Sequence, residues 1–148
     1  MISEERVLLL TGASGGVGRA IIKGLSEAGY QLALHYHDHF EELTSLLDEV
    51  KPKTKVALFQ ADLRNEDEVR EMVQSVVTAS GKIDVLVNNA GASLSAITWK
   101  QSLDEWNNII SLNLTAPFLV CKYVLPVMRT REYGRIINVS SVVAHIGM

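Results

Sequence analysis

Four glycines lie in the short stretch that follows the first apolar run of the chain. The run Val7–Leu10 leads into Thr-Gly-Ala-Ser-Gly-Gly-Val-Gly at residues 11–18, and helical periodicity begins after it. Glycine lets backbone N–H groups approach an anion closely, and the amino end of a helix adds unpaired N–H groups and the positive end of its dipole. The spacing of Gly12, Gly16 and Gly18 matches neither the G-x-G-x-x-G fingerprint nor the P-loop. We expect this turn to hold an anion, and the alternative is a glycine-rich turn without a ligand.

Polar residues also follow three later apolar runs. Asp62, the pair Asn88-Asn89 and the pair Ser140-Ser141 come directly after strand-like segments. In open α/β sheets, ligands bind at the carboxyl ends of the strands. These side chains are therefore candidates for a site at the same edge of a sheet as the glycine turn.

The elements that must position these residues alternate along the chain. Apolar runs predict strands at Val7–Leu10, Gln31–Tyr36, Lys55–Ala61, Ile83–Val87 and Arg135–Val139. Periods of three and four residues predict helices over Arg19–Ala28, Phe40–Val50, 65–81 and 102–129. Such βαβ alternation implies a doubly wound parallel sheet with helices on both faces. The fold class is therefore α/β, and 148 residues fit one domain.

Local signals predict where these helices begin and which faces they bury. Asn65 with Glu68, and Ser102 with Glu105, have the spacing of a capping box. Pro117 is expected to kink the last helix. The first helix is expected to turn its apolar side inward, with Ile21, Ile22, Leu25 and Ala28. The last helix has one apolar stripe, formed by Leu114, Phe118, Cys121, Leu125 and Met128.

Composition and charge argue against several functions. Hydrophobic residues make up 47% of the chain and charged residues 21%, and the net charge is −3 without a basic block. We therefore expect no nucleic-acid partner and no membrane partner. The apolar runs have the length of strands, so we expect no segment to span a bilayer, and residues 1–6 do not form a signal peptide. The single cysteine, Cys121, fits a buried thiol in the reducing cytoplasm.

Taken in order, five motifs resemble those of the short-chain dehydrogenase/reductase family. They are the T-G-x-x-x-G-x-G loop at Thr11–Gly18, Ala61-Asp62-Leu63, the N-N-A-G motif at Asn88–Gly91, Asn113 in S-L-N-L-T, and the segment from Gly134 to Ser141. The chain is most similar to members of the 3-oxoacyl-acyl-carrier-protein reductase type. The resemblance implies a three-layer Rossmann-type fold with strand order 3-2-1-4-5, and the family's C-terminal strands would be absent from this chain.

The resemblance also implies a role for each matching residue. The pyrophosphate of a dinucleotide would lie on the backbone around Gly12, Ser14, Gly16, Val17 and Gly18. The adenine amino group would contact Asp62, with Leu63 beside it, and the ribose side would be lined by Asn89, Ala90 and Gly91. Ser141 would be a catalytic residue that hydrogen-bonds the substrate oxygen. Asn113 would support a proton-relay water by perturbing the long helix.

The end of the second strand bears on the choice between NADP and NAD. In NAD-binding members, an acid at this point accepts a hydrogen bond from the ribose 2′-hydroxyl, and it would repel a 2′-phosphate. Counting about twenty residues from the glycine loop leads to Asp38. The resemblance to the family instead places Tyr36 at the acid position and His37, which can donate to a phosphate, at the basic position of NADP members. We therefore expect NADP, with NAD as the alternative. His35, His37 and His39 would share one strand face, but no Cys or carboxylate cluster completes a metal site, and we expect none.

The family's catalytic Tyr-x-x-x-Lys pair does not follow Ser141 in these 148 residues. We therefore expect residues 1–148 to be the dinucleotide-binding N-terminal portion of a longer single-domain enzyme, and to be inactive alone. The complete enzyme would reduce a ketone, such as a 3-oxoacyl thioester, with NADP(H), and it would form a dimer or tetramer. The alternative is a non-catalytic dinucleotide-binding or interaction domain that is complete at 148 residues.

Overall fold

A computed structural model describes residues 5–50, 52 and 54–146 of the chain. Five strands form one sheet: β1 (Arg6–Leu10), β2 (Tyr30–Tyr36), β3 (Val56–Gln60), β4 (Val85–Asn88) and β5 (Arg135–Asn138). All neighbouring strands run parallel, in the order β3-β2-β1-β4-β5. The predicted α/β class and the predicted strand order are therefore confirmed, and the predicted strand bounds differ from the observed ones by at most two residues.

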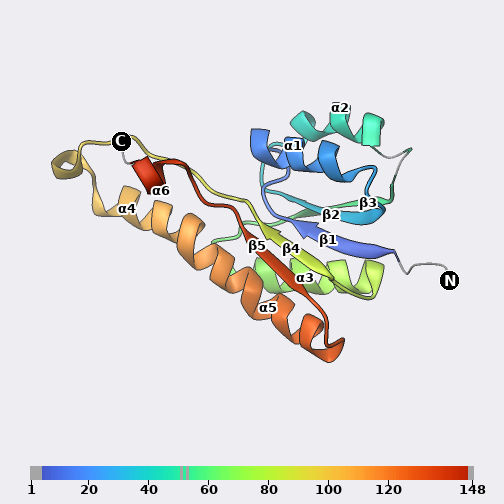
Figure 1. Cartoon of the computed structure of the whole chain (residues 1–148). Coiled ribbons are helices and arrows are strands. Elements are labelled where there is room, and N and C mark those ends of the chain that lie inside the picture. Colours follow the sequence, from blue (N-terminus) through green and yellow to red (C-terminus); the bar gives the residue numbers. More distant parts are fainter. Residues whose placement is uncertain (1–4, 51, 53, 147–148) are drawn as a thin grey trace.

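Helices cover both faces of this sheet (Figure 1). They are α1 (Gly16–Leu25), α2 (Glu41–Val50), α3 (Glu66–Ser80), α4 (Leu103–Ile110), α5 (Ala116–Thr130) and the short α6 (Val143–Ile146). A 3-10 turn, η1, spans Thr98–Lys100, and a π-helical turn, η2, spans Ser111–Thr115. The helices α1 and α2 lie on one face of the sheet, and α3 and α5 lie on the other. The molecule thus has three layers, as expected.

Each face of the sheet contributes to its own apolar core. Leu8 and Leu10 of β1 pack in the cluster that includes the inner faces of α1 and α2. Leu9 packs in the cluster with α3 and α5. Successive side chains of a strand point to opposite faces, so a strand covered on both sides reads as an uninterrupted apolar run. Because all five strands run parallel, their carboxyl ends lie at one edge of the sheet.

Helix α1 differs from the expectation at both of its ends. It begins at Gly16, inside the glycine turn, rather than at Arg19, and it ends at Leu25. Ala28, which we expected to face the core, is exposed. The chain leaves the helix before that residue and turns at Gly29, which has a positive φ of 75°. The glycine turn therefore supplies the first turn of the helix itself.

The capping predictions hold completely at one helix and in part at the other. Ser102 and Glu105 form a reciprocal capping box at the start of α4. Asn65 caps α3 by accepting from two backbone N–H groups, but the Glu68 carboxylate does not return the contact to the Asn65 backbone. It accepts instead from the backbone N–H of Asp62, at 2.7 Å. The cap of α3 is thereby joined to the loop that carries Asp62.

The expected disturbance near Pro117 takes the form of the π-helical turn η2. The N–H of Ala116 donates to the carbonyl oxygen of Ser111, five residues back. In a regular α-helix, residue 117 would donate to the carbonyl of residue 113, and proline has no N–H to do so. A π-helical turn is one way in which a helix absorbs such a break. Asn113 lies in the middle of this turn.

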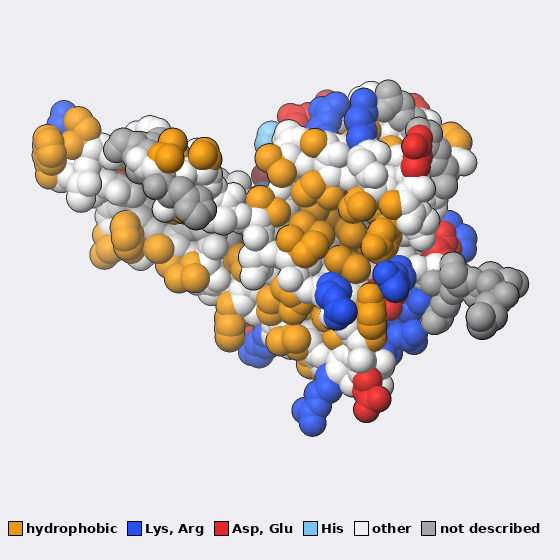
Figure 2. All heavy atoms as spheres, viewed as in Figure 1, with side chains coloured by type: hydrophobic (Ala, Val, Ile, Leu, Met, Phe, Trp, Pro, Cys, Tyr) orange, Lys and Arg blue, Asp and Glu red, His pale blue; other side chains and the backbone are white. Residues whose placement is uncertain are grey.

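The apolar stripe predicted on the last helix lies mostly on the outside of the molecule. Leu114, Phe118 and Leu125 are half exposed or more. Of the predicted stripe α5 buries Met128, and the other residues that it buries form a different face: Ala116, Leu119, Val120 and Val124. The edge strand β5 exposes Ile137 as well. Figure 2 shows hydrophobic side chains gathered between α1 and β5, and further ones along α4 and α5.

One finding differs from the expectation about membranes. By length and composition alone, the continuous helical stretch Leu103–Thr130 is apolar enough to cross a bilayer, although the separate apolar runs of the sequence are short. Within this stretch, α5 packs against α3 and β4, whereas α4 buries none of its residues in the described part of the chain. A mostly buried core helix meets the same criterion, but 22% of the apolar window in this stretch is buried.

Candidate functional site

The glycine loop after β1 makes two close approaches that a side chain would block. Gly12 has a φ of +66°, and a Cβ atom there would lie 2.7 Å from the Cα atom of Ala90. A Cβ atom at Gly18 would collide with the carbonyl oxygen of Gly12. Glycine is required at both positions, because one needs left-handed backbone and both need close packing. The loop is therefore pressed against the end of β4 and against the first turn of α1.

Gly16 has no such reason to be glycine. No heavy atom of the described residues lies within 4 Å of a Cβ atom built on it. It begins α1, whose N-cap residue, Gly15, has no side chain that could cap the helix. Val17, in the same turn, is 58% exposed. The outer side of this turn is therefore open to a ligand, as the phosphate-binding reading requires.

The electrostatics of α1 support the same reading. Its first turn contains no acidic residue. The first turns of α2, α3 and α4 each carry two or three carboxylates, which complement the positive end of a helix dipole. At α1, the N–H groups and the dipole are left to attract an external anion. The residues present thus fit a pyrophosphate held by the backbone from Gly12 through Ser14 to Gly18.

Thr11 and Asn89 join the glycine loop to the end of β4. The Thr11 hydroxyl oxygen accepts from the backbone N–H groups of Asn89 and Ala90, each at 3.0 Å. The Asn89 side-chain amide donates to the carbonyl oxygens of Thr11 and Gly12, each at 3.0 Å. These contacts hold Asn89 and Ala90 against the glycine loop and fix the position of the end of β4 relative to the end of β1.

Asn88 ties β4 to β5. Its Nδ2 atom donates to Oδ1 of Asn138, the residue paired with it across the two strands, at 2.8 Å. The same atom lies 3.4 Å from Sγ of Cys121 on α5, which is a half-buried free thiol. The buried Oδ1 atom of Asn88 has no hydrogen-bond partner among the described residues. The strand-tying role considered for this asparagine is therefore present.

Asn113 fixes the loop that follows β4. Its Oδ1 atom accepts from the backbone N–H of Ala92 at 3.0 Å, and its Nδ2 atom donates to the carbonyl oxygen of Ala92 at 2.8 Å. A Cβ atom at Gly91 would lie 3.0 Å from Oδ1 of Asn113. The π-helical turn thus aims this side chain at the segment after β4, where its amide accepts one hydrogen bond from Ala92 and donates one to it.

Ser141 follows β5 at the same edge of the sheet. It is exposed, and its Oγ atom accepts from the backbone N–H of Val143 at 3.4 Å, where α6 begins. A serine hydroxyl can accept and donate at once, so this contact leaves its hydrogen for another acceptor. The parallel topology places Ser141 beyond the carboxyl end of β5, next to the end of β4. The serine predicted from the sequence therefore lies at the carboxyl edge of the sheet, beside the end of β4.

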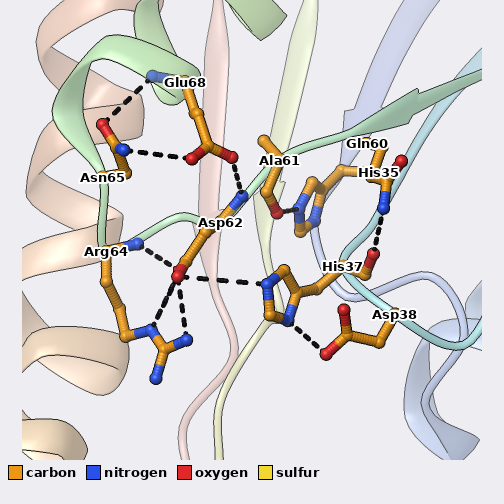
Figure 3. A network of polar contacts seen from close by, with 9 residues as sticks. All are labelled: His35, His37, Asp38, Gln60, Ala61, Asp62, Arg64, Asn65 and Glu68. Atoms are coloured by element: carbon orange, nitrogen blue, oxygen red, sulfur yellow. Dashed lines mark hydrogen bonds and ion pairs between the residues drawn. The ribbon is translucent and has the colours of Figure 1, made fainter.

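Four charged or ionisable side chains meet beyond the ends of β2 and β3 (Figure 3). Arg64 donates to both carboxylate oxygens of Asp62, at distances of 2.8 to 3.2 Å. His37 lies between two acids, with Nδ1 2.8 Å from the Asp38 carboxylate and Nε2 3.9 Å from the Asp62 carboxylate. Arg64 lowers the pKa of Asp62, chiefly through its side-chain hydrogen bond. Asp62 is thus a fixed anion that can accept a donor such as an adenine amino group.

The side chains of Tyr36 and Leu63 border this region, but both are packed against other parts of the protein. The ring of Tyr36 packs against Phe40 at the start of α2, with 5.5 Å between the ring centroids. Leu63 is buried in the core beneath α3, so only its backbone is at hand for a ligand. Of the residues predicted to bind the adenosine end, His37 and Asp62 therefore have side chains available for contact, and Asp38 and Arg64 lie beside them.

Replacing Arg64 with methionine is expected to raise the pKa of Asp62 toward its ordinary value of 3.8, because the guanidinium is the main cause of the lowering. A carbon-13 NMR titration of the Asp62 carboxyl measures this. The matched control is Arg70→Met, which removes an arginine of α3 that pairs with Asp67 instead. An unchanged Asp62 titration in Arg64→Met would contradict the role given to this pair.

Three residues of the site were not singled out from the sequence. Thr11 was noted as part of the loop motif, but no role was predicted for it. Arg64 could have been found from its spacing, because an arginine two residues after Asp62 can reach the carboxylate of Asp62. His35 was considered only as part of a histidine row that could bind metal. Its imidazole is buried between the glycine loop and the end of β3. In the described part of the chain, no three His, Cys, Asp or Glu residues are grouped to hold a metal ion.

The parallel sheet and the site at its edge define a class of protein. A strand order of 3-2-1-4-5, with a glycine turn between β1 and α1 and polar residues at the ends of β3, β4 and β5, defines a doubly wound Rossmann-type α/β protein. The sequence profile of the short chain dehydrogenase family matches residues 6–148. The chain belongs to the short-chain dehydrogenase family of oxidoreductases.

Named relatives and solved structures share this assignment. The chain is 37% identical over 140 residues to the 3-oxoacyl-[acyl-carrier-protein] reductase FabG of Staphylococcus epidermidis, covering 94% of this chain and 57% of that protein. It superposes on a metagenomic short-chain oxidoreductase in complex with NADP with a TM-score of 0.88, at 32% identity, covering 96% of this chain and 65% of that one. For NAD⁺-bound xylitol dehydrogenase the TM-score is 0.90, at 33% identity, with 100% and 57% covered. The chain thus spans a little over half the length of the curated relative.

Proposed function

We propose that this chain is the cofactor-binding part of an NADP(H)-dependent reductase that converts a ketone into an alcohol. The observation that carries the proposal is the contrast within the glycine loop. Packing requires glycine at positions 12 and 18, whereas Gly16 opens on free space at the uncomplemented amino end of α1. A dinucleotide pyrophosphate is the ligand that such a turn suits in a doubly wound fold.

The chain also offers residues for the contacts that the adenine, the ribose and the substrate would make. Asp62 would accept from the adenine amino group, and Asn89, Ala90 and Gly91 would line the ribose side. When bound, the reduced dinucleotide supplies a hydride to the carbonyl carbon. Ser141 would donate its hydroxyl hydrogen to the carbonyl oxygen and so orient the substrate, while Asn113 would hold the loop after β4 and support a proton-relay water from its π-helical turn.

The choice of NADP over NAD rests on the end of β2. Tyr36 brings no carboxylate to the place where an acid would repel a 2′-phosphate, and its ring is packed against Phe40. His37 can donate to a phosphate, and Arg64 adds a positive charge on the opposite side of Asp62. The solved relatives above include one with NADP and one with NAD⁺. We therefore assign NADP as the preferred cofactor.

The wider setting is proposed from the relatives. The curated relative is a 3-oxoacyl-[acyl-carrier-protein] reductase, so a 3-oxoacyl thioester is our candidate substrate. The proton that completes the alcohol needs an acid, and the Tyr-x-x-x-Lys pair that the family uses does not occur in these 148 residues. We propose that residues 1–148 act within a longer cytoplasmic enzyme and do not catalyse alone. The exposed stripe of Leu114, Phe118 and Leu125 would suit contact between copies in a dimer or tetramer.

Oxidation of NADPH by the product of the complete reading frame, with an acetoacetyl thioester as substrate, tests the proposal. Ser141→Ala is expected to lower kcat by about a hundredfold or more, because an oxygen-directed hydrogen bond is lost. Ser140→Ala is the matched control and is expected to retain most of the rate. Equal rates for wild type and Ser141→Ala would refute the catalytic assignment, and turnover by residues 1–148 alone would refute the proposed need for further residues. Dinucleotide binding without any turnover by the complete product would favour the non-catalytic alternative.

A further inference from the structure

The side chain of His35 holds two segments of the site through its two ring nitrogens. It lies on β2 and is 2% exposed. The backbone N–H of Gly12 donates to Nδ1 at 3.1 Å, and Nε2 lies 3.0 Å from the carbonyl oxygen of Ala61. Figure 3 shows the imidazole turned toward Ala61, the residue before Asp62. The backbone of His35 also accepts from the N–H of Ala13 at 2.9 Å.

These contacts determine which ring nitrogen carries the proton. A backbone N–H is only a donor, so Nδ1 must be the acceptor and hence unprotonated. Nε2 then carries the hydrogen and donates it to the carbonyl oxygen of Ala61, which is only an acceptor. A doubly protonated ring would set an N–H of His35 against the N–H of Gly12. The observed arrangement therefore exists only with a neutral imidazole of one tautomer.

We propose that His35 is a positioning residue for dinucleotide binding, which in its neutral Nε2–H form holds the Gly12 end of the pyrophosphate loop at a set distance from the Asp62 end of the adenosine site. The proposal rests on the proposed function, because it concerns how that function's two half-sites are kept in register. Gly12 and Asp62 are 50 residues apart in the chain. His35 lies between them in sequence and in space, so a single side chain transmits the position of one to the other.

The surroundings of His35 favour the neutral form. Burial lowers its pKa below the ordinary value of 6.5, and the positive charge that His37 can carry acts in the same direction. The Ala61 carbonyl and the Asp62 carboxylate oppose this, and Arg64 partly offsets the charge of Asp62. On the other side, the positive end of the α1 dipole faces the loop. Acid should therefore break the Gly12 contact and weaken dinucleotide binding.

The same shift makes folding depend on pH with a definite sign. Since the folded pKa lies below 6.5, the unfolded chain takes up the proton first as the pH falls. The free energy of unfolding contributed by neutral His35 is therefore present above pH 6.5 and is lost as the pH falls from there toward the folded pKa. A variant without an ionisable group at this position should lack that part of the pH dependence.

Calorimetric binding of NADH to the product of the complete reading frame, at pH 8 and at pH 5.5, tests the proposal. NADH is the probe because it has no 2′-phosphate to respond to the charge of His37. We expect His35→Leu to bind about tenfold more weakly at pH 8, the effect of one lost hydrogen bond. His35→Asn, which is short but can still accept from Gly12, should bind within about threefold of wild type and respond less to acid. His39→Asn, at an exposed histidine two residues beyond His37, is the matched control and should leave both properties unchanged.

Two readouts without cofactor separate this role from general destabilisation. Nitrogen-15 NMR should show the Nε2–H tautomer of His35 at pH 8, and the Gly12 amide should exchange its hydrogen faster in His35→Leu while amides of α3 do not. Equal NADH affinity or equal Gly12 exchange in His35→Leu and wild type would overturn the positioning role. Failure of the wild type to bind either NADH or NADPH would instead overturn the proposed function, and the positioning role with it.

Discussion

Gly12→Ala is expected to destabilise the fold by about 2–5 kcal/mol, the sum of left-handed backbone strain and overpacking. Gly12 has a φ of +66°, and the added methyl would lie 2.7 Å from the Cα atom of Ala90. The backbone around Ala90 cannot give way easily, because hydrogen bonds to the side chains of Thr11 and Asn89 hold the end of β4 against the glycine loop. Urea denaturation followed by circular dichroism measures the loss. A free energy of unfolding equal to that of wild type would contradict the packing described for this loop.

Gly16→Ala is expected to separate binding from folding. Its Cβ atom meets nothing within the described residues, and alanine is favoured over glycine in a helix by roughly 0.5–1 kcal/mol, so stability should be kept or raised. The methyl would occupy the side on which we place the pyrophosphate and should weaken NADPH binding by about tenfold or more. Gly24→Ala, at an exposed position in the last turn of α1, is the matched control with a similar gain and no loss of affinity. If Gly16→Ala binds NADPH as wild type does, the open side of this turn is not the phosphate site.

Thr11→Val is the second large effect, with an expected loss of about 2–4 kcal/mol in the free energy of unfolding. Valine has the shape of threonine, so no cavity forms. The partly buried backbone N–H groups of Asn89 and Ala90 would lose their shared acceptor, and the buried carbonyl of Val87 would lose a donor. Chemical denaturation measures the loss, and amide exchange at Asn89 and Ala90 locates it.

Thr11→Ser supplies the matched control for this experiment. It keeps the hydroxyl and removes one buried methyl group, for which a loss of about 1 kcal/mol is expected. The hydrogen-bond account of Thr11 requires valine to be clearly worse than serine. If the two variants lose equal stability, the methyl matters more than the hydroxyl, and the join between β1 and β4 has another source.

The central strands β1 and β4 were predictable because both are buried on both faces. Val7–Leu10 and Ile83–Val87 are continuous apolar runs, and their bounds differ from those of β1 and β4 by one or two residues. The ends of the helices were less predictable than the bounds of these strands. Gly16 looked like turn and yet begins α1. Glycine is less favourable in a helix than alanine by about 0.5–1 kcal/mol, so its residue type argues against a helix start that tertiary contacts impose. At the last helix, periodicity found an apolar stripe but could not tell which face the sheet covers.

The candidate site was foreseen as a set of residues more than as a set of contacts. Spacing and motif indicated Asp62, Asn89, Asn113 and Ser141, and the parallel topology brings them to one edge of the sheet. The sequence did not show their contacts within the fold. Asn113 donates a hydrogen bond to the backbone of Ala92, and Asp62 accepts one from Arg64. Whether Ser141 and Asn113 take part in catalysis stays a prediction.

The sequence by itself determined the class of this protein: the order of strands and helices, the place of the glycine turn and the family of oxidoreductases to which it belongs. Those properties depend on burial patterns and on motifs within a few residues of one another. Only the tertiary structure decided how the site is held together. The tie from Gly12 through His35 to Ala61 joins three strand ends far apart in the chain. Such a contact depends on which atoms meet when the sheet closes, and its protonation state follows from those partners and from burial.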